Sequence, residues 1–577
     1  MDQETKNCQN CKKDFTIESD DFAFYDKLGI LPPTFCPNCR LQRRMAHRNE
    51  RSLYKRQCDL CKKDIISMYD PSEPFIAYCR DCWWGDKWDT LSSGNDYDFS
   101  ESFFKQYEKL LKRAPLLGLS NLNSINSEYG NFTDGNKGCY LVFGAGFDEN
   151  VFYSRMANWT KDSMDLLNVG KSELMYECVN CHESYRLRYS QNCKSCTDSF
   201  FLYNCRNCSQ CFGCVNLVSK SYCVFNKQYT KEEYQEKVSG MNCGSLKSKE
   251  AVETEVQKLL DSSIHKYANI TGSTNCTGDC IDFSKNCKHC FDVYKDCENT
   301  KYTFSTISLK DNYDSMGQFS NDFSCENVDN DIGNSNKFTI TVYASNNVHY
   351  SFNCHGSSNL FGCTGLKQKN YCILNKQYTK EEYEELVPKI IEQMNSVPYV
   401  DKKGRAYKYG EFFPIELSSF AYNETIAQEY FPLTKGEALI QGYKWKDKEA
   451  RTYTVDIKNE NIPDDIKDAD ADILNKVIQC GHKGSCKHQC TEAFKIISAE
   501  LKFYQRMNLP LPRLCPNCRH YERLAKRNPP SLWHRQCMCD KNHQHHTGKC
   551  NNEFETAYSP DRKEIIYCEQ CYQAEIL

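Results

Sequence analysis

The chain has 577 residues, of which 38 are cysteine, and a formal net charge of −4 at pH 7. Residues 1–13 are polar and lack the apolar stretch of an export signal, and no run reaches the ~20 apolar residues that a membrane span needs. These features argue against an exported or membrane-spanning protein and predict a cytoplasmic one. Because thiols stay reduced in that compartment, regularly paired cysteines are expected to bind metal rather than form disulfides.

The first predicted domain, residues 1–92, contains four Cys-x-x-Cys pairs. Two residues between thiolates let a tight turn present both sulfurs to one ion, and two such pairs complete a tetrahedral zinc site with Zn–S bonds of about 2.3 Å. The simplest grouping is sequential, although interleaved pairing stays open. The predicted ligands are Cys8, Cys11, Cys36 and Cys39 for one site and Cys58, Cys61, Cys79 and Cys82 for the other. Such closed sites are expected to hold the fold rather than catalyse.

A basic segment lies between the two sites of this domain. Residues 40–56 carry seven Lys and Arg against one acid. Arg40, Arg44 and Arg48 are spaced by four and would line one face of a helix. Guanidinium groups bind phosphates bidentately, so this face, with Arg51, is predicted to contact RNA or DNA. Two structural alternatives remain: pairing with acidic loops elsewhere in the chain, or stabilisation of the zinc thiolates by the positive charges.

Residues 93–130 are predicted to form a helical linker. Residues 100–114 within it carry an amphipathic stripe that is expected to dock the first domain on the central region. The stripe consists of Phe103, Phe104, Tyr107, Leu110 and Leu111.

The central region is duplicated. Residues 212–238 match residues 361–387 at an offset of 149, which predicts a first β-repeat lobe at 131–240 and a second at 241–400. Each copy closes with a capping-box signal that predicts a helical cap. These signals begin at Thr230 and Thr379.

Short β-like runs recur in these lobes every 10 to 14 residues, separated by Asn, Asp, Ser and Gly. This spacing predicts a parallel β-solenoid, with a Greek-key sandwich as the rival. The many central cysteines have two interpretations: pairs from stacked coils that hold a metal, or a column of small buried thiols.

The chain then continues through an aromatic-rich connecting segment, residues 401–475, and a helix predicted from Ile462 to Gln479. The last predicted domain, residues 476–577, repeats the first: Arg513–Cys537 matches Thr34–Cys58 at an offset of 479.

The zinc ligands predicted for this second copy have less regular spacing. They are Cys486, Cys490, Cys515 and Cys518 for one site and Cys537, Cys539, Cys568 and Cys571 for the other. A ten-residue insert before Tyr558 offers His545 and Cys550 as additional or substitute ligands, with Cys550 a rival to Cys539. The basic segment recurs, and its Arg519, Arg523 and Arg527 are predicted to bind nucleic acid as their counterparts do.

The Cys-Pro-Asn-Cys-Arg motif at Cys36 and at Cys515, followed by a basic helix, resembles the treble-clef zinc-ribbon superfamily. The overall order of paired ribbons around a Cys/Asn/Tyr-rich middle is similar to a group of uncharacterised multi-zinc-ribbon proteins of candidate-phyla bacteria. The resemblance implies zinc at the matching cysteines, and it implies no activity.

The sequence as a whole predicts a mainly β protein with small α+β zinc modules, in which a β-solenoid-like region is flanked by duplicated treble-clef or zinc-ribbon domains. We expect a non-enzymatic protein with about four zinc ions per chain that binds RNA or DNA. A zinc-stabilised protein–protein interaction scaffold is the alternative, and a metal- or thiol-dependent oxidoreductase comes third. No small-molecule substrate and no membrane partner is indicated.

Overall fold

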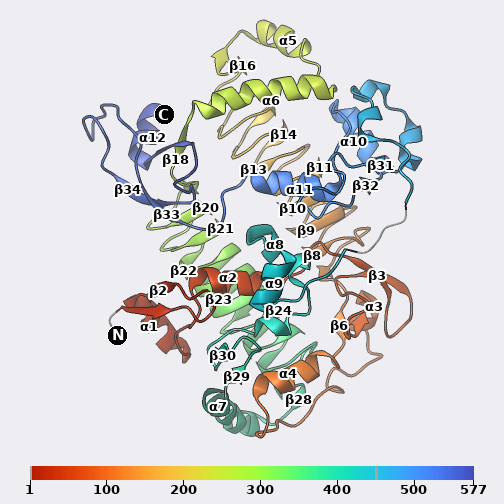
Figure 1. The fold of residues 1–577 in the computed structure, drawn as a ribbon, viewed down its shortest axis with the longest axis vertical. Helices are drawn as coiled ribbons and strands as arrows, with labels where there is room; N and C mark the ends of the chain where they lie inside the picture. The colour runs from red at the N-terminus through yellow and green to blue at the C-terminus, as the bar shows by residue number, and fades with distance from the viewer. Residues whose placement is uncertain (1–2, 449–452, 577) are drawn as a thin grey trace.

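The computed structural model describes residues 3–448 and 453–576, and its largest part is a pair of β-solenoid lobes (Figure 1). The outer limits of the predicted terminal domains, residues 1–2 and 577, lie outside the described residues. Residues 449–452 of the connecting segment lie outside them as well.

The first lobe is built from short parallel strands, each paired with the strand one coil away. Val169, for example, pairs with Cys181, so a coil takes 12 residues. The strands are β7 (Asn121–Leu122), β8 (Asn131–Asp134), β9 (Tyr140–Gly146), β10 (Glu149–Asn158), β11 (Lys161–Met164), β12 (Leu167–Gly170), β13 (Val179–His182), β14 (Tyr185–Arg188) and β15 (Thr197–Phe200). An antiparallel pair, β16 (Cys223–Val224) and β17 (Lys227–Gln228), ends the lobe.

The second lobe has the same construction, and Val342 pairs with Cys354 one coil away. Its strands are β19 (Ile270–Thr271), β20 (Gly278–Asp282), β21 (Cys290–Tyr294), β22 (Glu298–Lys301), β23 (Phe304–Asn334), β24 (Ile340–His349), β25 (Phe352–His355), β26 (Ser358–Phe361), β27 (Asn370–Ile373) and β28 (Lys376–Gln377). Parallel pairing between successive coils confirms the solenoid prediction and rules out the Greek-key sandwich.

The coils turn at every third residue. Asn180, Glu183, Arg186 and Tyr189 all have a positive φ, so one 12-residue coil contains four turning points. Asparagine tolerates this left-handed conformation better than most residues. A coil that turns so often leaves a narrow interior, and the inward positions are therefore filled by Ser, Cys, Val, Thr and Asn.

The inward side chains also form hydrogen bonds with backbone N–H and C=O groups of the coils. The Ser184 hydroxyl donates to the carbonyl of His182 at 2.9 Å and accepts from the N–H of Cys196, one coil further, at 3.2 Å. The Cys181 thiol donates to the carbonyls of Val179 and Ser190 at 3.5 and 3.4 Å. Small polar side chains thus supply hydrogen-bond partners to backbone groups of the interior.

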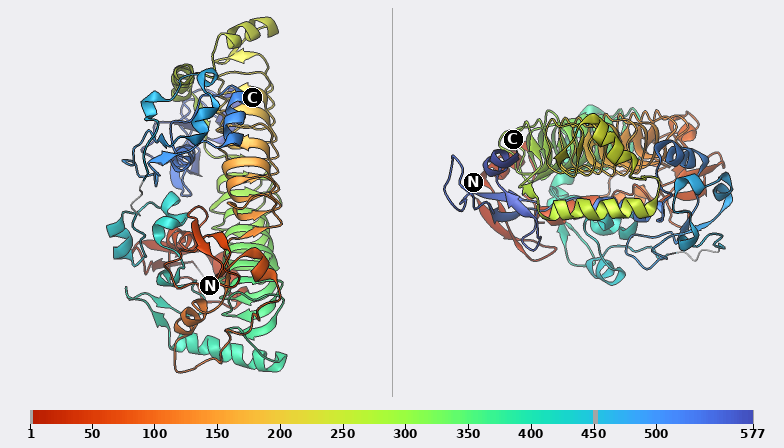
Figure 2. Two further views of the ribbon diagram at one scale, coloured as in Figure 1. Left: turned by 90° about the vertical axis from the view of Figure 1, so that its right-hand side faces the viewer. Right: turned by 90° about the horizontal axis from the view of Figure 1, so that it is seen from above.

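The two lobes lie side by side and run in opposite directions. The Ser120 hydroxyl lies 2.9 Å from the Tyr343 hydroxyl, and Asn168 donates to the Tyr294 hydroxyl at 2.7 Å. Since the first lobe advances from residue 120 to 168 while the second returns from 343 to 294, the stacks are antiparallel. Figure 2 shows them forming one long column, with the terminal modules along one side.

Helices cover the two free ends of the column. One end carries α5 (Lys231–Ser239), and the other end carries α7 (Lys380–Ser396). Helix α6 (Leu246–Asp261), which follows α5, crosses the face of the column on the side of the terminal modules. Thr230 and Thr379 form the capping boxes that the sequence predicts, because each hydroxyl accepts from the N–H of the glutamate three residues later at 3.2 Å.

The N-terminal module packs on the second lobe. It comprises β1 (Glu4–Asn7), β2 (Asp14–Ile17), α1 (Ser19–Leu28), α2 (Pro37–Met45), β3 (Tyr54–Gln57), β4 (Asp64–Ser67), β5 (Ala77–Tyr78) and α3 (Arg80–Trp84). Helix α4 (Phe103–Leu111) and β6 (Leu116–Leu117) follow it. The predicted apolar stripe of α4 is buried, and Phe103 packs against Tyr350 and Phe361 of the second lobe.

The C-terminal module packs on the first lobe. It comprises β31 (Ile478–Gln479), β32 (Ala493–Phe494), α10 (Ser498–Met507), α11 (Pro516–Ala525), β33 (Trp533–Gln536), β34 (Glu553–Thr556), β35 (Ile565–Tyr567) and α12 (Glu569–Ile576). Strand β18 (Ile264–Lys266), between the lobes, pairs with β35.

The connecting segment before this module contains β30 (Ala406–Tyr407), which pairs with β29 (Tyr399–Val400) just ahead of it, and then α8 (Ala427–Tyr430) and α9 (Lys435–Gln441). The helix predicted from Ile462 to Gln479 is wrong: short 3-10 turns at Ile466–Asp468 and Ala471–Asn475 replace it, and the segment ends in β31. Asp465 and Asp470 cap these turns, and the buried isoleucines that suggested a helix instead pack against α10.

Among the described residues, no helix has the length and apolarity to span a bilayer.

Candidate metal centres

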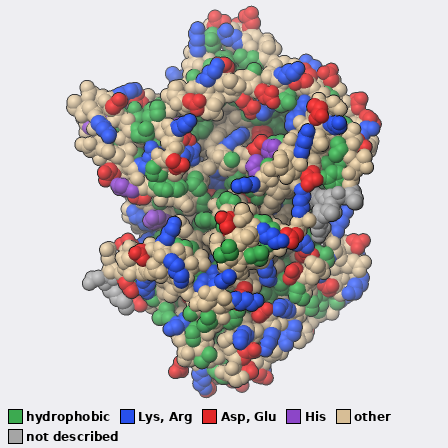
Figure 3. Space-filling view, viewed as in Figure 1, with side chains coloured by type: hydrophobic (Ala, Val, Ile, Leu, Met, Phe, Trp, Pro, Cys, Tyr) green, Lys and Arg blue, Asp and Glu red, His purple; other side chains and the backbone are tan. Residues whose placement is uncertain are grey.

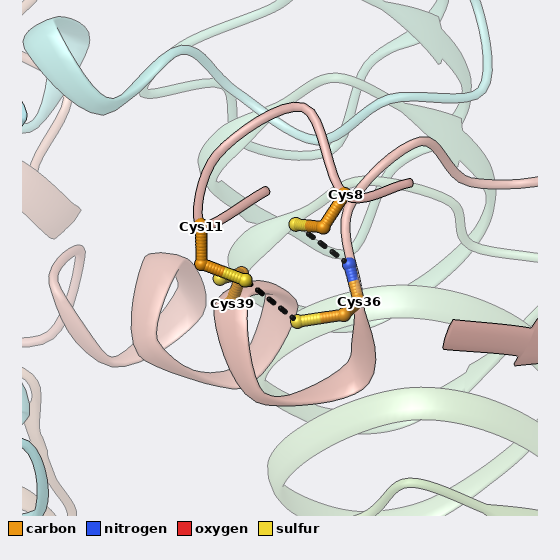
Figure 4. Close-up of side chains that lie close together, drawn as sticks. All are labelled: Cys8, Cys11, Cys36 and Cys39. Carbon is orange, nitrogen blue, oxygen red and sulfur yellow. Dashed lines mark hydrogen bonds between the residues drawn. The ribbon is translucent and has the colours of Figure 1, made fainter. Parts of the chain in front are cut away.

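The first metal centre joins a hairpin to a helix. The turn between β1 and β2 carries Cys8 and Cys11, and α2 begins directly after Cys36 with Cys39 in its first turn. The four sulfurs lie within 4.8 Å of one another, and Figure 4 shows them facing a common centre. Four thiols so close together fit one tetrahedral, soft metal ion and leave no coordination position open.

The second centre repeats this arrangement. The turn between β3 and β4 carries Cys58 and Cys61, while Cys79 precedes α3 and Cys82 lies within it. Their sulfurs also lie within 4.8 Å of one another. The structure therefore brings together all eight predicted N-terminal thiols, in the sequential grouping.

Each centre places a backbone N–H against one of its sulfurs. The donor is always the cysteine just before the helix, and the acceptor is the first cysteine of the hairpin. The pairs are Cys36 to Cys8 at 3.2 Å, Cys79 to Cys58 at 3.2 Å, Cys515 to Cys480 at 3.3 Å and Cys568 to Cys537 at 3.2 Å. Such hydrogen bonds stabilise metal-bound thiolates, and their recurrence defines four equivalent sites.

In each N-terminal centre the first hairpin cysteine has a pKa below the ordinary thiol value, which favours the thiolate form that binds metal. Burial raises the pKa of Cys58, but the backbone N–H groups of Cys61 and Cys79 outweigh it and lower the pKa to about 7. The thiols of Cys36 and Cys39 hold the pKa of Cys8 far below its ordinary value.

The C-terminal centres differ from the predicted ligand sets. The buried groups are Cys480, Cys490, Cys515 and Cys518 in one centre and Cys537, Cys550, Cys568 and Cys571 in the other. The predictions of Cys486 and Cys539 as members of these sets are wrong. Cys480 takes the place of Cys486, and Cys550 displaces Cys539.

Inserts inside the hairpin turns explain the difference. In all four centres the N–H of the first cysteine donates to the carbonyl two residues beyond the second, for example Cys8 to Lys13 and Cys480 to Glu492. The hydrogen bond that closes the turn is thus the same in all four centres, while the number of residues in the turn changes. Cys480 and Cys490 are ten positions apart, where Cys8 and Cys11 are three apart.

The sequence indicates one of the two changes of ligand, Cys550 in place of Cys539. Cys550, Cys568 and Cys571 all lie 489 positions after their N-terminal counterparts, so the ten-residue insert must fall between Cys537 and Cys550. Cys480 has no such signal, because the residues before Cys8 and Cys480 share too little to fix the register.

The arginines of the predicted nucleic-acid face point into the protein. Arg40 and Arg44 both contact Asp314 of the second lobe, at 2.9 and 3.0 Å, and Arg44 also reaches Glu326 at 3.4 Å. Arg48 pairs with Asp329 at 3.0 Å. The Arg44 side chain is fully buried. The expectation that these groups form a phosphate-binding surface is therefore wrong, and the alternative of pairing with acids elsewhere in the chain is the one observed.

The C-terminal arginines are used in the same way. Arg519 and Arg523 both contact Asp165 of the first lobe, at 3.3 and 2.8 Å. Arg523 also reaches Glu177 at 3.4 Å, and Arg527 pairs with Asp292 of the second lobe. Burial raises the pKa of Asp165, which the two guanidinium groups oppose, to about 6, so this carboxylate is ionised at neutral pH.

The two interfaces correspond at the first two arginines of each set, although Arg48 and Arg527 pair with carboxylates that are not equivalent. Asp314 and Glu326 lie 149 positions after Asp165 and Glu177, which is the offset of the lobe duplication. Tyr302 and Tyr153 share that offset: the guanidinium of Arg40 lies over the Tyr302 ring at 5.0 Å, and that of Arg519 over the Tyr153 ring at 4.7 Å. The module and lobe duplications therefore preserve one common interface, used twice.

Arg51 links the two modules to each other. Its side chain donates to the Asn517 amide oxygen at 3.1 Å and lies 3.8 Å from Glu429 of α8. His520 contacts the same carboxylate at 3.1 Å. Burial lowers the pKa of His520 to about 4, so the imidazole is neutral at pH 7 and this contact is not an ion pair.

The central cysteines form a column of buried thiols. In the first lobe this column consists of Cys178, Cys181, Cys193, Cys196, Cys205, Cys208, Cys211, Cys214 and Cys223. The Cys208 thiol donates to the carbonyls of Arg206 and Leu217 at 3.4 Å each. These thiols have the role that Ser184 has in other coils.

A polar cavity of about 700 Å³ lies between the lobes, α6 and the C-terminal module. Amide side chains line it from several elements: Asn180, Gln191, Asn192, Gln257 and Asn269. Its lining carries four Lys and Arg side chains against five Asp and Glu, and two ion pairs among them are Arg527 with Asp292 and Arg562 with Glu564. The cavity therefore offers hydrogen-bonding groups with little net charge.

Comparison with known proteins gives no independent assignment: no protein-family model matches the chain, and no curated protein matches it.

Proposed function

We propose that the protein is a non-enzymatic, zinc-stabilised interaction scaffold. The observation that carries this proposal is the pair of equivalent interfaces, in which a helix emerging from a four-thiol centre inserts buried arginines into a solenoid lobe. Metal binding fixes each helix to its hairpin, and the arginines fix each helix to the solenoid. The result is a rigid body that presents a central polar cavity.

Zinc is the metal that the donor sets favour. Four thiolates in a closed tetrahedral set, supplied by two turns, are typical of structural zinc sites. Redox chemistry at the metal would require an open coordination position, and the closed four-thiol sets offer none. Their burial instead couples metal binding to folding of the module.

The partner that best fits the cavity is a polar, uncharged peptide segment. Amides bind peptide backbones through both their donor and their acceptor, and the rim already shows this chemistry, because Gln191 donates to the backbone carbonyl of Lys526 at 2.6 Å. Figure 3 shows the face hollowed beneath α6, with basic and acidic side chains interspersed around it. A surface of mixed charge favours a peptide over a polyanion.

A random peptide library displayed on phage tests this proposal on the zinc-loaded protein. Asn192→Trp fills the cavity, and Asn207→Trp is the matched control, because Asn207 is exposed and has the same left-handed backbone as Asn192. Peptides that bind the wild type and the control but not Asn192→Trp would support the cavity as the binding region.

Peptides that bind all three proteins equally would contradict the cavity as the binding region. If no peptide is enriched while RNA or DNA binds with a steep salt dependence, the nucleic-acid alternative replaces the scaffold. Fewer than about two zinc ions per purified chain would contradict the metal-stabilised fold itself.

A further inference from the structure

The hairpin inserts of the C-terminal module carry metal-binding side chains that the four-thiol centres do not use. The first insert lies between Cys480 and Cys490 and holds His482, Cys486 and His488. The second lies between Cys537 and Cys550 and holds Cys539, His543, His545 and His546. The corresponding N-terminal turns have two residues each and contain neither histidine nor a further cysteine.

The first insert folds back on its own metal centre. Ligand atoms of His482, Cys486, His488 and Cys518 lie within 4.8 Å of one another, and the Cys486 and Cys518 sulfurs are 3.6 Å apart. The Nδ1 atoms of both histidines are buried and have no hydrogen-bond partner. The other nitrogen of His482 lies 3.7 Å from the Glu522 carboxylate. A carboxylate behind a histidine is the usual support for a metal-binding imidazole.

The second insert does the same at the other centre. The Cys539 sulfur lies 3.3 Å from His543 Nε2, and His546 Nε2 lies 3.1 Å from the Cys571 sulfur. His546 Nδ1 lies 2.9 Å from the carbonyl of Gly548, so Nδ1 carries the proton and Nε2 has a free lone pair. His545 Nε2, at 3.3 Å from Cys571, can replace His546.

Both inserts converge on the same position of the fold. Cys518 and Cys571 are each the last cysteine of a centre and lie in the first turn of a helix, as Cys39 and Cys82 do in the N-terminal module. A thiolate has several lone pairs and can bridge two ions. The first insert therefore supplies three new ligands around a fourth that is already in place. The second insert brings His546 to Cys571 and pairs Cys539 with His543, whose ring lies 5.2 Å from that of His546.

We propose that each insert binds a second metal ion, so that the C-terminal module holds two thiolate-bridged metal pairs. The proposal rests on the proposed zinc sites and deepens them. Two cysteines and two histidines in a tetrahedral set select zinc among the common divalent ions. The charge also favours the pair: one Zn²⁺ with four thiolates carries −2, whereas two Zn²⁺ with five thiolates and neutral imidazoles carry −1.

Native mass spectrometry of the zinc-loaded full chain counts these ions. We expect six per wild-type chain: four in the thiol centres and one for each insert. The double variants His482→Ala/His488→Ala and His543→Ala/His546→Ala should each lose one ion. His534→Ala, at an exposed histidine of the same module, should keep all six.

A wild-type count of four would overturn the second sites while leaving the proposed function intact, whereas a count below four would contradict the thiol centres themselves. A count of five would overturn the proposal for the insert whose double variant loses nothing. X-ray absorption on the wild type provides a readout independent of variant folding, since bridged pairs require a metal–metal distance of about 3.5–4 Å. Absence of that distance would also overturn the proposal.

Discussion

The two terminal modules share their interface with the solenoid but differ in their metal-binding turns. Arg44 and Arg523 meet equivalent carboxylates on the two lobes, and each of their centres places the same N–H against the same sulfur. The N-terminal turns are short, whereas the C-terminal turns contain inserts rich in histidine and cysteine. The contacts of the buried interface therefore differ less between the two modules than the spacing of the metal ligands does.

Replacement of the last cysteine of a metal centre should have the largest effect, and its result should differ between the two modules. Cys39→Ser is expected to release one ion and Cys518→Ser two, since Cys518 belongs to two ligand groups. Zinc binding contributes on the order of 10–16 kcal/mol to folding of small zinc domains, so both modules should lose their structure, as circular dichroism and metal analysis would show. Cys243→Ser is the control and should keep every ion. Equal losses from Cys39→Ser and Cys518→Ser would leave the modules indistinguishable.

The arginine interface should be the next most sensitive feature. Arg44→Met and Arg523→Met each remove one of the two guanidinium groups that pair with a buried carboxylate, and only Arg40 or Arg519 is left beside it. The cost should reach at most the ~3–5 kcal/mol of a fully broken buried pair. Arg44→Met should cost more, because Glu326 is almost fully buried while Glu177 is partly exposed. Urea unfolding at saturating zinc measures both. The exposed pair of Arg186 with Asp198 gives the control Arg186→Met, expected within about 1 kcal/mol of wild type. A cost for Arg44→Met as small as that of the control would contradict the buried interface.

Acid should destabilise the N-terminal module through His47, a position where the C-terminal copy has Lys526. Burial, with Arg43 nearby, lowers the pKa of His47 to about 3, below the unfolded value of about 6.5. The unfolded chain therefore takes up the proton first, and the free energy of unfolding falls by about 1.4 kcal/mol per pH unit as the pH drops below about 6.5.

His47→Met should remove this loss and move the acid-unfolding midpoint to lower pH, measured by fluorescence in excess zinc. The exposed His534 provides the control, and His534→Gln should not move the midpoint in that direction. If His47→Met leaves the profile unchanged, His47 is not the group that titrates.

The smallest effect is expected from the solenoid cysteines, in contrast to those of the modules. Cys208→Ser keeps a donor for the carbonyls of Arg206 and Leu217, so the cost should be within about 1 kcal/mol. Thermal unfolding measures the change in stability, and metal analysis measures the number of bound ions. Loss of an ion from Cys208→Ser would show that the thiol column binds metal after all.

Much of the fold could be predicted because it is repeated. The 12-residue coil, the lobe offset of 149 and the module offset of 479 are all visible in the chain, as are the capping boxes at Thr230 and Thr379. The role of the arginines could not be predicted. The sequence pattern of a helix with charges spaced by four is the same whether the charges face water or a buried carboxylate. The carboxylate that Arg44 contacts, Asp314, lies 270 positions away in the sequence.

The prediction of the C-terminal metal ligands failed for a different physical reason. Closure of a hairpin turn depends on the hydrogen bond across it, which tolerates an insert of any length that can loop out. Cys-x-x-Cys spacing is therefore not necessary for a metal-binding pair. It is not sufficient either, because Cys178 and Cys181 have this spacing inside the thiol column. The pair Cys480 and Cys490 has no spacing signature, whereas Cys486 resembles a ligand of the main centre without belonging to it.

Hydrogen exchange of α2 and α11, followed by mass spectrometry with and without a zinc chelator, tests the central claim most directly. The account predicts that both helices are strongly protected in the metal-loaded protein, because their arginines are buried against the lobes. It also predicts that the chelator removes this protection from both. Rapid exchange in the metal-loaded protein, as on an exposed basic helix, or protection that persists without metal, would contradict it.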